Sequence, residues 1–216
     1  MERIYCLLIG YVFGLFQTAY IYGRANGIDI RKHGSGNAGT TNALRVLGKK
    51  AGFIVLLGDA LKCILAIVTV TIIFQKLEPD MIYLLKLYGA TGAILGHNFP
   101  FFLKFRGGKG IAATAGLVIA FHWYFLPVAC ILFFGALFFT HYVSLGSLLV
   151  YTGFMIELII LGQMGIFKLG NNLLIELYLL GAFLTIMAFV KHRENIGRLL
   201  RREERKTFIT KSNKDK

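Results

Sequence analysis

Three polar segments interrupt this apolar chain, and each carries residue types that bind oxygen-rich anions. The first, residues 31–45, has three glycines within six residues, so that successive backbone N–H groups can face one anion. Its side-chain donors are Ser35, Asn37, Thr40, Thr41 and Asn42. The spacing is not that of a Walker loop, so a nucleotide is not implied. A solvated loop with a helix cap explains this segment equally well on its own.

The second segment, residues 96–110, ends in Gly107-Gly108-Lys109-Gly110 and is followed by small residues. If a helix begins at Ile111, its free N–H groups and positive dipole end point toward whatever Lys109 binds, which favours phosphate. Lys104 and Arg106 either join Lys109 or anchor the loop to lipid headgroups. A lone histidine such as His97, just before an Asn-Phe-Pro break, is more often a structural hydrogen-bonder than a catalyst.

The third segment, residues 192–200, follows the last apolar run. His192, Asn195 and Leu199 share one face at helical spacing, so an imidazole and an amide can reach the same site. From residue 201 the chain mixes charge signs, and we interpret it as a solvated or lipid-touching tail without chemistry.

The elements that position these segments are long apolar runs, residues 4–22, 51–74, 81–95 and 111–190. A membrane span needs roughly 20 apolar residues. The last run therefore provides four crossings, with turns near residues 122–123, 140–141 and 162–172. Two crossings there would also leave the total number of crossings odd. However, two helices of about 40 residues would each be roughly 60 Å long. The sequence predicts an all-α polytopic membrane protein with about seven transmembrane helices.

Charge orients this protein. The formal net charge is +13, and most of the 24 Lys and Arg residues flank the three polar segments or lie in the tail. Because basic residues mark cytoplasmic ends, the N-terminus is predicted outside and the C-terminus cytoplasmic. All three polar segments then face the cytoplasm. These charges lie beside apolar helices, so headgroup attraction explains them and no nucleic acid partner is expected.

Two ionisable residues, Asp59 and Lys62, lie inside the second apolar run at i, i+3 spacing. Charges this deep in a membrane are costly, so they serve either function or a structural pairing of helices. The cysteines have no paired spacing and no histidine companions, so neither a disulfide nor a metal site is expected. They are Cys6, Cys63 and Cys130.

Together, residues 35–42, 96–100 with 107–110, and 192–200 resemble the bacterial acyl-phosphate:glycerol-3-phosphate acyltransferase family, PlsY. Asp59 and Lys62 look like the family's Asp-x-x-Lys pair. In one departure, the family usually has glycine two residues before a glutamate, where this chain has Arg202 before Glu204. Neither the turn nor a role for Glu204 is carried over.

The resemblance implies transfer of a fatty acyl group from acyl phosphate to the 1-hydroxyl of glycerol-3-phosphate. The products are lysophosphatidic acid and phosphate, in the first step of phospholipid synthesis. The expected location is the bacterial inner (plasma) membrane, multi-pass, with the active site facing the cytoplasm. We expect residues 1–200 to form the integral membrane acyltransferase domain and residues 201–216 a basic cytoplasmic tail. No cofactor, metal or obligate protein partner is implied.

The resemblance also assigns residues to roles. The expected catalytic residues are Ser35, Asn37, His192 and Asn195. The acyl phosphate is expected on Ser35, Gly36, Asn37, Gly39 and Thr41. Glycerol-3-phosphate is expected on Arg45, Lys104, Gly107, Gly108 and Lys109. Supporting roles fall to Asp59, Lys62 and His97. The general base is either His192 or a substrate phosphate oxygen, whose second pKa lies near neutrality.

Two other classes of protein compete with an enzyme. A transporter of a phosphorylated solute would also explain Asp59 and Lys62, but no internal repeat is evident and the polar segments lie on one side. A noncatalytic scaffold that binds anionic lipids explains the charge but not the glycine spacing. The sequence therefore favours the acyltransferase.

Overall fold

The structure, a computed structural model, describes residues 1–208, and over that range its regular elements are helices. The first group comprises α1 (Glu2–Gly14), α2 (Thr18–Ala25), η1 (Ile30–Lys32), α3 (Thr40–Leu47), α4 (Lys49–Phe74), η2 (Pro79–Met81) and α5 (Ile82–Asn98). The second comprises η3 (Phe101–Leu103), α6 (Ile111–Phe121), α7 (Phe125–Thr140), α8 (Val143–Gln163), α9 (Asn171–Lys191) and α10 (Arg193–Leu200).

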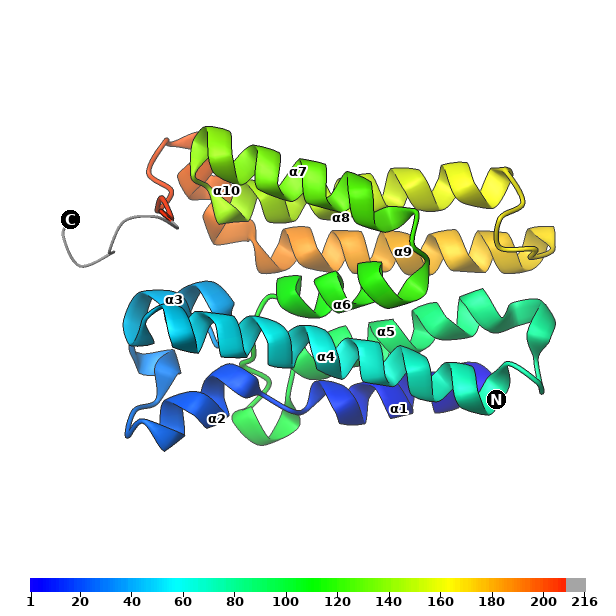
Figure 1. Ribbon diagram of the computed structural model, residues 1–216, viewed down its shortest axis with the longest axis horizontal. Coiled ribbons are helices and arrows are strands. Elements are labelled where there is room, and N and C mark those ends of the chain that lie inside the picture. The colour runs from blue at the N-terminus through cyan, green and yellow to red at the C-terminus, as the bar shows by residue number, and fades with distance from the viewer. Residues whose placement is uncertain (209–216) are drawn as a thin grey trace.

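The helices form two layers (Figure 1). One layer contains α1 to α5 and the other contains α7 to α10, with α6 between them. In the first layer α1 and α5 approach closely at glycines, since a Cβ on Gly14 would lie 2.9 Å from the Cα of Gly96. Such small-residue contacts let helix backbones pack tightly where lipid offers no hydrophobic driving force.

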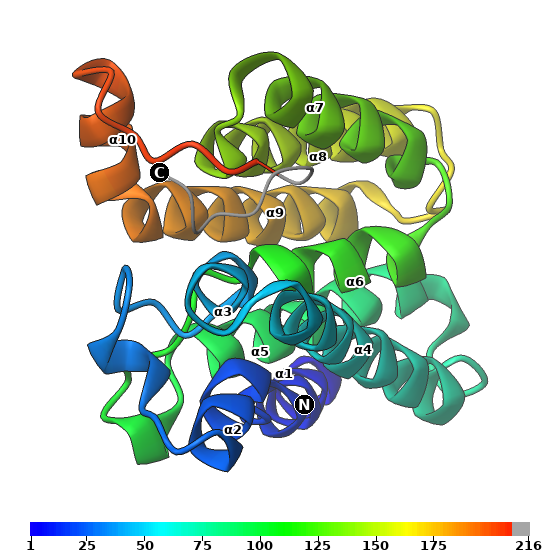
Figure 2. The same cartoon turned by 60° about the vertical axis from the view of Figure 1, so that its left-hand side comes forward.

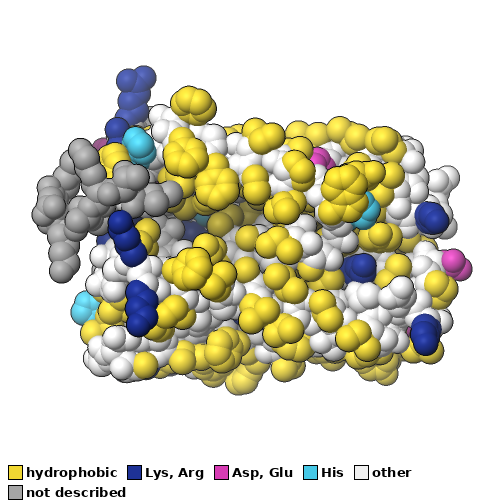
Figure 3. Space-filling view, viewed as in Figure 1, with side chains coloured by type: hydrophobic (Ala, Val, Ile, Leu, Met, Phe, Trp, Pro, Cys, Tyr) yellow, Lys and Arg dark blue, Asp and Glu magenta, His cyan; other side chains and the backbone are white. Residues whose placement is uncertain are grey.

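Hydrophobic side chains cover much of the face that Figure 3 shows, and the Lys and Arg side chains lie mainly toward its two ends. Within residues 1–208, four helical segments are long and apolar enough to cross a membrane: Glu2–Ala25, Lys49–Phe74, Val143–Gln163 and Asn171–Lys191. The apolar helices α6 and α7 are shorter, with 11 and 16 residues. At 1.5 Å per residue they measure about 16 and 24 Å, less than the roughly 30 Å hydrocarbon core. Their turn lies short of the end that α8 and α9 reach (Figure 1).

The predicted turns in the last apolar run are confirmed, because helices end at Phe121, Thr140 and Gln163 and begin again at Phe125, Val143 and Asn171. The apolar run over residues 4–22 lies in a segment, Glu2–Ala25, that is long and apolar enough to cross a membrane, but the chain breaks within it between α1 and α2. At the break the buried side chain of Gln17 donates hydrogen bonds to the carbonyl oxygens of Gly14 and Gly96, each 3.1 Å away. This amide satisfies backbone carbonyls from two helices, which a continuous helix could not present to it.

An ion pair joins the two layers at the end of the molecule where the chain begins. Arg3 and Tyr88 both donate to the carboxylate of Glu176, at 2.8 Å from Arg3 Nη2 and 2.8 Å from the Tyr88 hydroxyl. These side chains join α1, α5 and α9. With both layers clamped here, the opening between them lies at the other end.

Candidate active site

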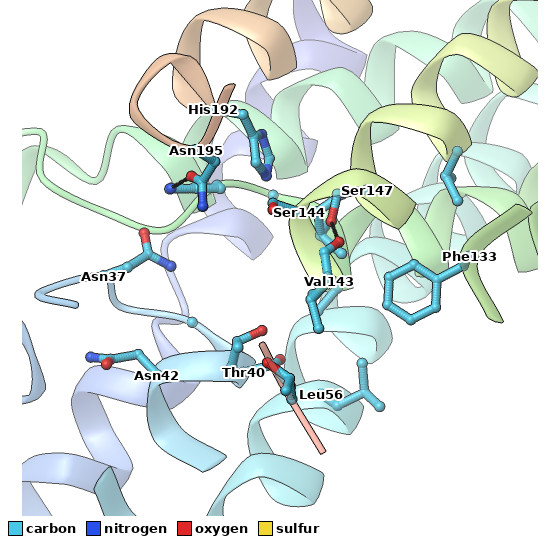
Figure 4. Close-up of a pocket in the computed structure, with 18 of the residues that line it drawn as sticks. Asn37, Thr40, Asn42, Leu56, Phe133, Val143, Ser144, Ser147, His192 and Asn195 are labelled. Carbon is cyan, nitrogen blue, oxygen red and sulfur yellow. Dashed lines mark hydrogen bonds between the residues drawn. The ribbon is translucent and has the colours of Figure 1, made fainter. Parts of the chain in front are cut away.

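A cavity of about 880 Å³ lies between the two layers, at the end where the three polar segments meet. Figure 4 shows side chains from both layers converging on it. One part of its wall is polar and the other is apolar. The predicted site residues that line it are Ser35, Gly36, Asn37, Gly39, Thr41, Arg45, Asp59, His97, Lys109, His192 and Asn195. Lys62, Lys104, Gly107 and Gly108 are not part of this wall.

The first loop, residues 33–39 between η1 and α3, presents the N-terminus of α3 to the cavity. Gly39 is the N-cap, and Thr40 and Thr41 begin the helix, so their backbone N–H groups have no partner within it. The Thr40 hydroxyl oxygen is buried without a hydrogen-bond partner among residues 1–208. Unused N–H groups and the positive end of a helix dipole are features that favour the binding of an anion.

The sequence predicts Asn42 as a donor to the anion, but its side chain bonds to the backbone of the first loop instead. Its carbonyl oxygen accepts from the backbone N–H of Ser35 at 2.8 Å. Its Nδ2 donates to the carbonyl oxygens of Ile30 and His33, at 3.1 and 3.0 Å. The loop bends through Gly36 at φ 72°, a conformation that residues with a Cβ rarely adopt. Asn42 therefore braces the loop, and Asn37 remains to face the cavity (Figure 4).

The second loop, residues 99–110 between α5 and α6, folds back onto the end of α5. The backbone N–H groups of Gly107 and Gly108 donate to the carbonyl oxygens of Asn98 and His97, at 3.2 and 3.1 Å. A Cβ on Gly108 would collide with the His97 imidazole and lie 2.9 Å from the Ala38 carbonyl oxygen. Gly108 thus lets the first and second loops meet over His97. It shapes the site from outside the cavity wall.

Two lysines of the second loop have different positions. Lys109 lines the cavity and its ammonium contacts the amide oxygen of Asn195. Burial, with Arg198 nearby, lowers the pKa of Lys109. Lys104 is exposed and lies in a left-handed turn at φ 55°. The α6 helix begins at Ile111 as predicted, with Gly110 as N-cap, so a second helix N-terminus faces the cavity.

The third segment brings His192 and Asn195 to the cavity from the junction of α9 and α10 (Figure 4). His192 Nδ1 lies 2.8 Å from the carbonyl oxygen of Ala188. A carbonyl can only accept, so Nδ1 carries the proton and the lone pair of the neutral ring is on Nε2. Burial lowers the pKa of His192 to about 4, so the ring is neutral near pH 7.

Sequence reasoning missed a part of the site that lies beyond residue 200. Glu204 accepts from Asn195 Nδ2 at 2.6 Å, from Arg198 Nε at 2.7 Å and from the Ser144 hydroxyl at 3.1 Å. Arg202 adopts the left-handed conformation, at φ 60°, that glycine favours, so the turn before Glu204 forms despite the substitution. The prediction of a tail without chemistry from residue 201 therefore needs correction. The usable signal was the glutamate itself, at the position where the PlsY family has one.

A cluster of buried charges lies beneath the first two loops. Lys62 Nζ donates to Asp59 Oδ1 at 2.8 Å, to the carbonyl oxygen of Phe16 at 2.7 Å and to His97 Nδ1 at 2.8 Å. The Thr18 hydroxyl also donates to Asp59 Oδ1, at 3.0 Å. The predicted pairing of Asp59 with Lys62 is present, and it joins the break between α1 and α2 to the end of α5.

The apolar part of the cavity runs between α4, α6, α7 and α8. Its lining includes Leu56, Val118, Ile119, Leu126, Ala129, Cys130, Phe133, Phe134, Leu137 and Val150. A sequence signal for these residues was absent, because most positions of the surrounding runs are apolar as well. Among residues 1–208, no group of three His, Cys, Asp or Glu side chains is placed to hold a metal ion.

Known proteins share much of this sequence. A family model described as Glycerol-3-phosphate acyltransferase matches residues 4–202. The chain is 38% identical over 208 residues to Glycerol-3-phosphate acyltransferase 2 of Bacillus cereus, covering 96% of each protein. It is also 38% identical over 218 residues to Glycerol-3-phosphate acyltransferase of Mycoplasmopsis synoviae, covering 94% of this chain and 93% of the relative.

Two solved structures resemble the fold, and both are of PlsY, an integral membrane glycerol 3-phosphate acyltransferase. The glycerol 3-phosphate form superposes with a TM-score of 0.79 at 29% identity, covering 96% of both chains. The lysophosphatidic acid form has a TM-score of 0.80 at 25% identity, again covering 96% of both chains. The arrangement of helices around the cavity is thus shared with an enzyme crystallised in two ligand forms.

Proposed function

This chain belongs to the glycerol-3-phosphate acyltransferase family, and we propose that it transfers a fatty acyl group from acyl phosphate to the 1-hydroxyl of glycerol-3-phosphate. The products are lysophosphatidic acid and phosphate. The observation that carries the proposal is one cavity with a cationic, N–H-rich part and a continuous apolar part. Such a cavity matches two phosphorylated substrates, one of which carries a long acyl chain.

The proposed topology has seven membrane segments, with the N-terminus outside and the site facing the cytoplasm of the bacterial cell. The segments are α1 with α2, then α4, α5, α6, α7, α8 and α9. The basic residues of the first loop, the second loop and α10 support this orientation, since Lys and Arg favour cytoplasmic ends. The short α6 and α7 fit the scheme as a pair whose turn stops short of the outer ends of α8 and α9.

The acyl phosphate is proposed to bind at the first loop. Its phosphate accepts from Ser35, Asn37 and the N-terminal N–H groups of α3, around Gly36, Gly39 and Thr41. Its acyl chain follows the apolar lining along α6 and α7. Thr40 joins the predicted set, because its buried hydroxyl faces the same part of the cavity.

Glycerol-3-phosphate is proposed to bind against Arg45 and Lys109. Several cations are needed, because one exposed ion pair contributes only about 1 kcal/mol or less. Gly107 and Gly108 act by shaping the loop that positions Lys109. The exposed Lys104 lies outside the cavity wall, and its predicted contact with substrate stays a prediction.

In the proposed reaction the 1-hydroxyl oxygen attacks the acyl carbonyl carbon, the bond from that carbon to the phosphate oxygen breaks, and phosphate leaves. The hydroxyl proton passes to a phosphate oxygen, whose second pKa of about 6 makes it the better base. His192 Nε2, in a ring with a pKa of about 4, accepts a hydrogen bond from the hydroxyl and orients it. Positioned donors around the carbonyl then lower the barrier without a covalent enzyme intermediate.

The test measures phosphate release by the purified protein in detergent, with palmitoyl phosphate and with or without glycerol-3-phosphate. Release should depend on glycerol-3-phosphate and be lost in Asn37→Ala. Mass spectrometry should detect lysophosphatidic acid in equal amount. An absence of both products from a folded protein would reject the acyltransferase and favour a transporter.

A further inference from the structure

Residues 203–207, here called the strap, cross the mouth of the cavity after α10. Glu204 fixes one end through Asn195, Arg198 and Ser144. At the other end the backbone N–H of Thr207 donates to the carbonyl oxygen of His141 at 2.8 Å, and Thr207 is buried. Figure 2 shows this part of the chain running from α10 toward α7 and α8.

Between these two anchors the strap presents Arg205 to the cavity, on the same wall as Arg45 from the last turn of α3. Within residues 1–208 neither guanidinium has a hydrogen bond or an ion pair. The neighbouring Arg198 differs, since Glu204 neutralises it at 2.7 Å. Burial, and then the charge of Arg205, lowers the pKa of Arg45, in agreement with their proximity.

We propose that Arg205 binds the phosphate of glycerol-3-phosphate together with Arg45, an assignment that rests on the proposed acyltransferase function. Two guanidinium groups that share a wall repel each other until an anion lies between them. A phosphate monoester supplies that anion, and its oxygens match the planar guanidinium fork.

The position of the pair favours glycerol-3-phosphate over the acyl donor. Arg45 lies five residues beyond Thr40, which places it about 7 Å along α3 from the N-terminal anion site. The donor's phosphate occupies that N-terminal site, and its acyl chain must reach the apolar lining. The second phosphate therefore falls to the guanidinium groups at the mouth.

The experiment measures KM for each substrate and kcat in Arg205→Gln and Arg205→Lys. Arg205→Gln should raise KM for glycerol-3-phosphate about fivefold or more, as loss of a charge-assisted contact implies, with kcat and KM for palmitoyl phosphate little changed. Arg205→Lys should restore part of the affinity, because it keeps the charge without the fork. Arg201→Gln is the matched control, since within residues 1–208 the Arg201 guanidinium pairs with Glu203 and Arg201 is not part of the cavity wall.

A second variant tests whether the strap positions Arg205. Thr207→Pro removes the N–H that bonds to His141, so it should also raise KM for glycerol-3-phosphate. Combined with Arg205→Gln it should add little, because both act through one side chain. Fully additive effects would reject the positioning role.

Two results would overturn the assignment of Arg205: an unchanged KM for glycerol-3-phosphate, or a rise confined to palmitoyl phosphate. A readout without turnover gives the same decision, since glycerol-3-phosphate alone should raise the Tm of the wild type more than that of Arg205→Gln. Failure of the proposed function is distinguishable, because the wild type would then show no phosphate release that depends on glycerol-3-phosphate.

Discussion

Two groups of charges lie on either side of the same loops, and they are built in opposite ways. In the buried cluster of Asp59, Lys62 and His97, each residue is at most 3% exposed, and all three donors of the Lys62 ammonium have partners. At the mouth, Arg45 and Arg205 have no partner within the described chain. A buried ammonium with all its donors paired holds helices together, whereas guanidinium groups without partners are available to a ligand.

The largest expected effect is on stability, in the buried cluster. Asp59→Ala leaves the Lys62 ammonium buried without its counterion, which costs about 3–5 kcal/mol. Thermal unfolding in detergent should show a large fall in Tm. The double variant Asp59→Ala with Lys62→Met should recover most of this loss, because no buried charge remains. A single variant as stable as the wild type would contradict the structural role of the cluster.

The next largest effect is expected where the second loop contacts His97 of the buried cluster. Gly108→Ala places a methyl group against the His97 ring and the Ala38 carbonyl, which displaces the loop that carries Lys109. A shift of 1 Å in an active site can cost about 100-fold in rate, and we expect a loss of that order in kcat/KM. Gly135→Ala is the control, because a Cβ there meets nothing within 4 Å. Similar losses in both variants would reject the contact as the cause.

A smaller effect separates the two possible bases. Because the pKa of His192 is lowered to about 4, the ring stays neutral as pH falls from 8 to 5, and it loses its acceptor only as pH approaches 4. A fall in kcat/KM near pH 6 then reports the substrate phosphate, whose second pKa is about 6. His192→Gln should lower kcat roughly tenfold and leave that limb in place. Disappearance of the limb in this variant would make His192 the base.

An effect of similar size, confined to the choice of acyl donor, is expected in the apolar part of the cavity, away from both groups of charges. The lining on α7 extends from Leu126 to Leu137, a rise of about 16 Å along the helix, which is close to half the hydrocarbon thickness. Leu126→Trp should shorten this space and shift kcat/KM from palmitoyl toward lauroyl phosphate by about tenfold. Phe138→Trp is the control, since Phe138 is exposed and outside the lining. An unchanged ratio would place the acyl chain elsewhere.

The sequence alone predicted much of the candidate site. Glycines, amides and cations within short polar segments stand out against apolar runs, and most of those chosen, such as Asn37, Lys109 and His192, do line one cavity. The apolar lining could not be chosen, because Cys130 and Phe133 look like any other residue of an all-apolar helix. In the sequence, Lys104 and Lys109 are equivalent lysines of one polar segment. The turn at Lys104 leaves that side chain exposed, whereas Lys109 lines the cavity.

The helices and their turns were determined locally, since runs of apolar residues and the breaks between them depend on the neighbouring chain alone. Only the tertiary structure decided the break at Gln17 and the course of the strap. Gln17 leaves the helix because it can donate to the carbonyl oxygen of Gly96, 79 residues away. Glu204 reaches the site because it accepts a hydrogen bond from the Ser144 hydroxyl, 60 residues earlier in the chain. Such contacts depend on how distant helices pack, and no local pattern in the sequence contains them.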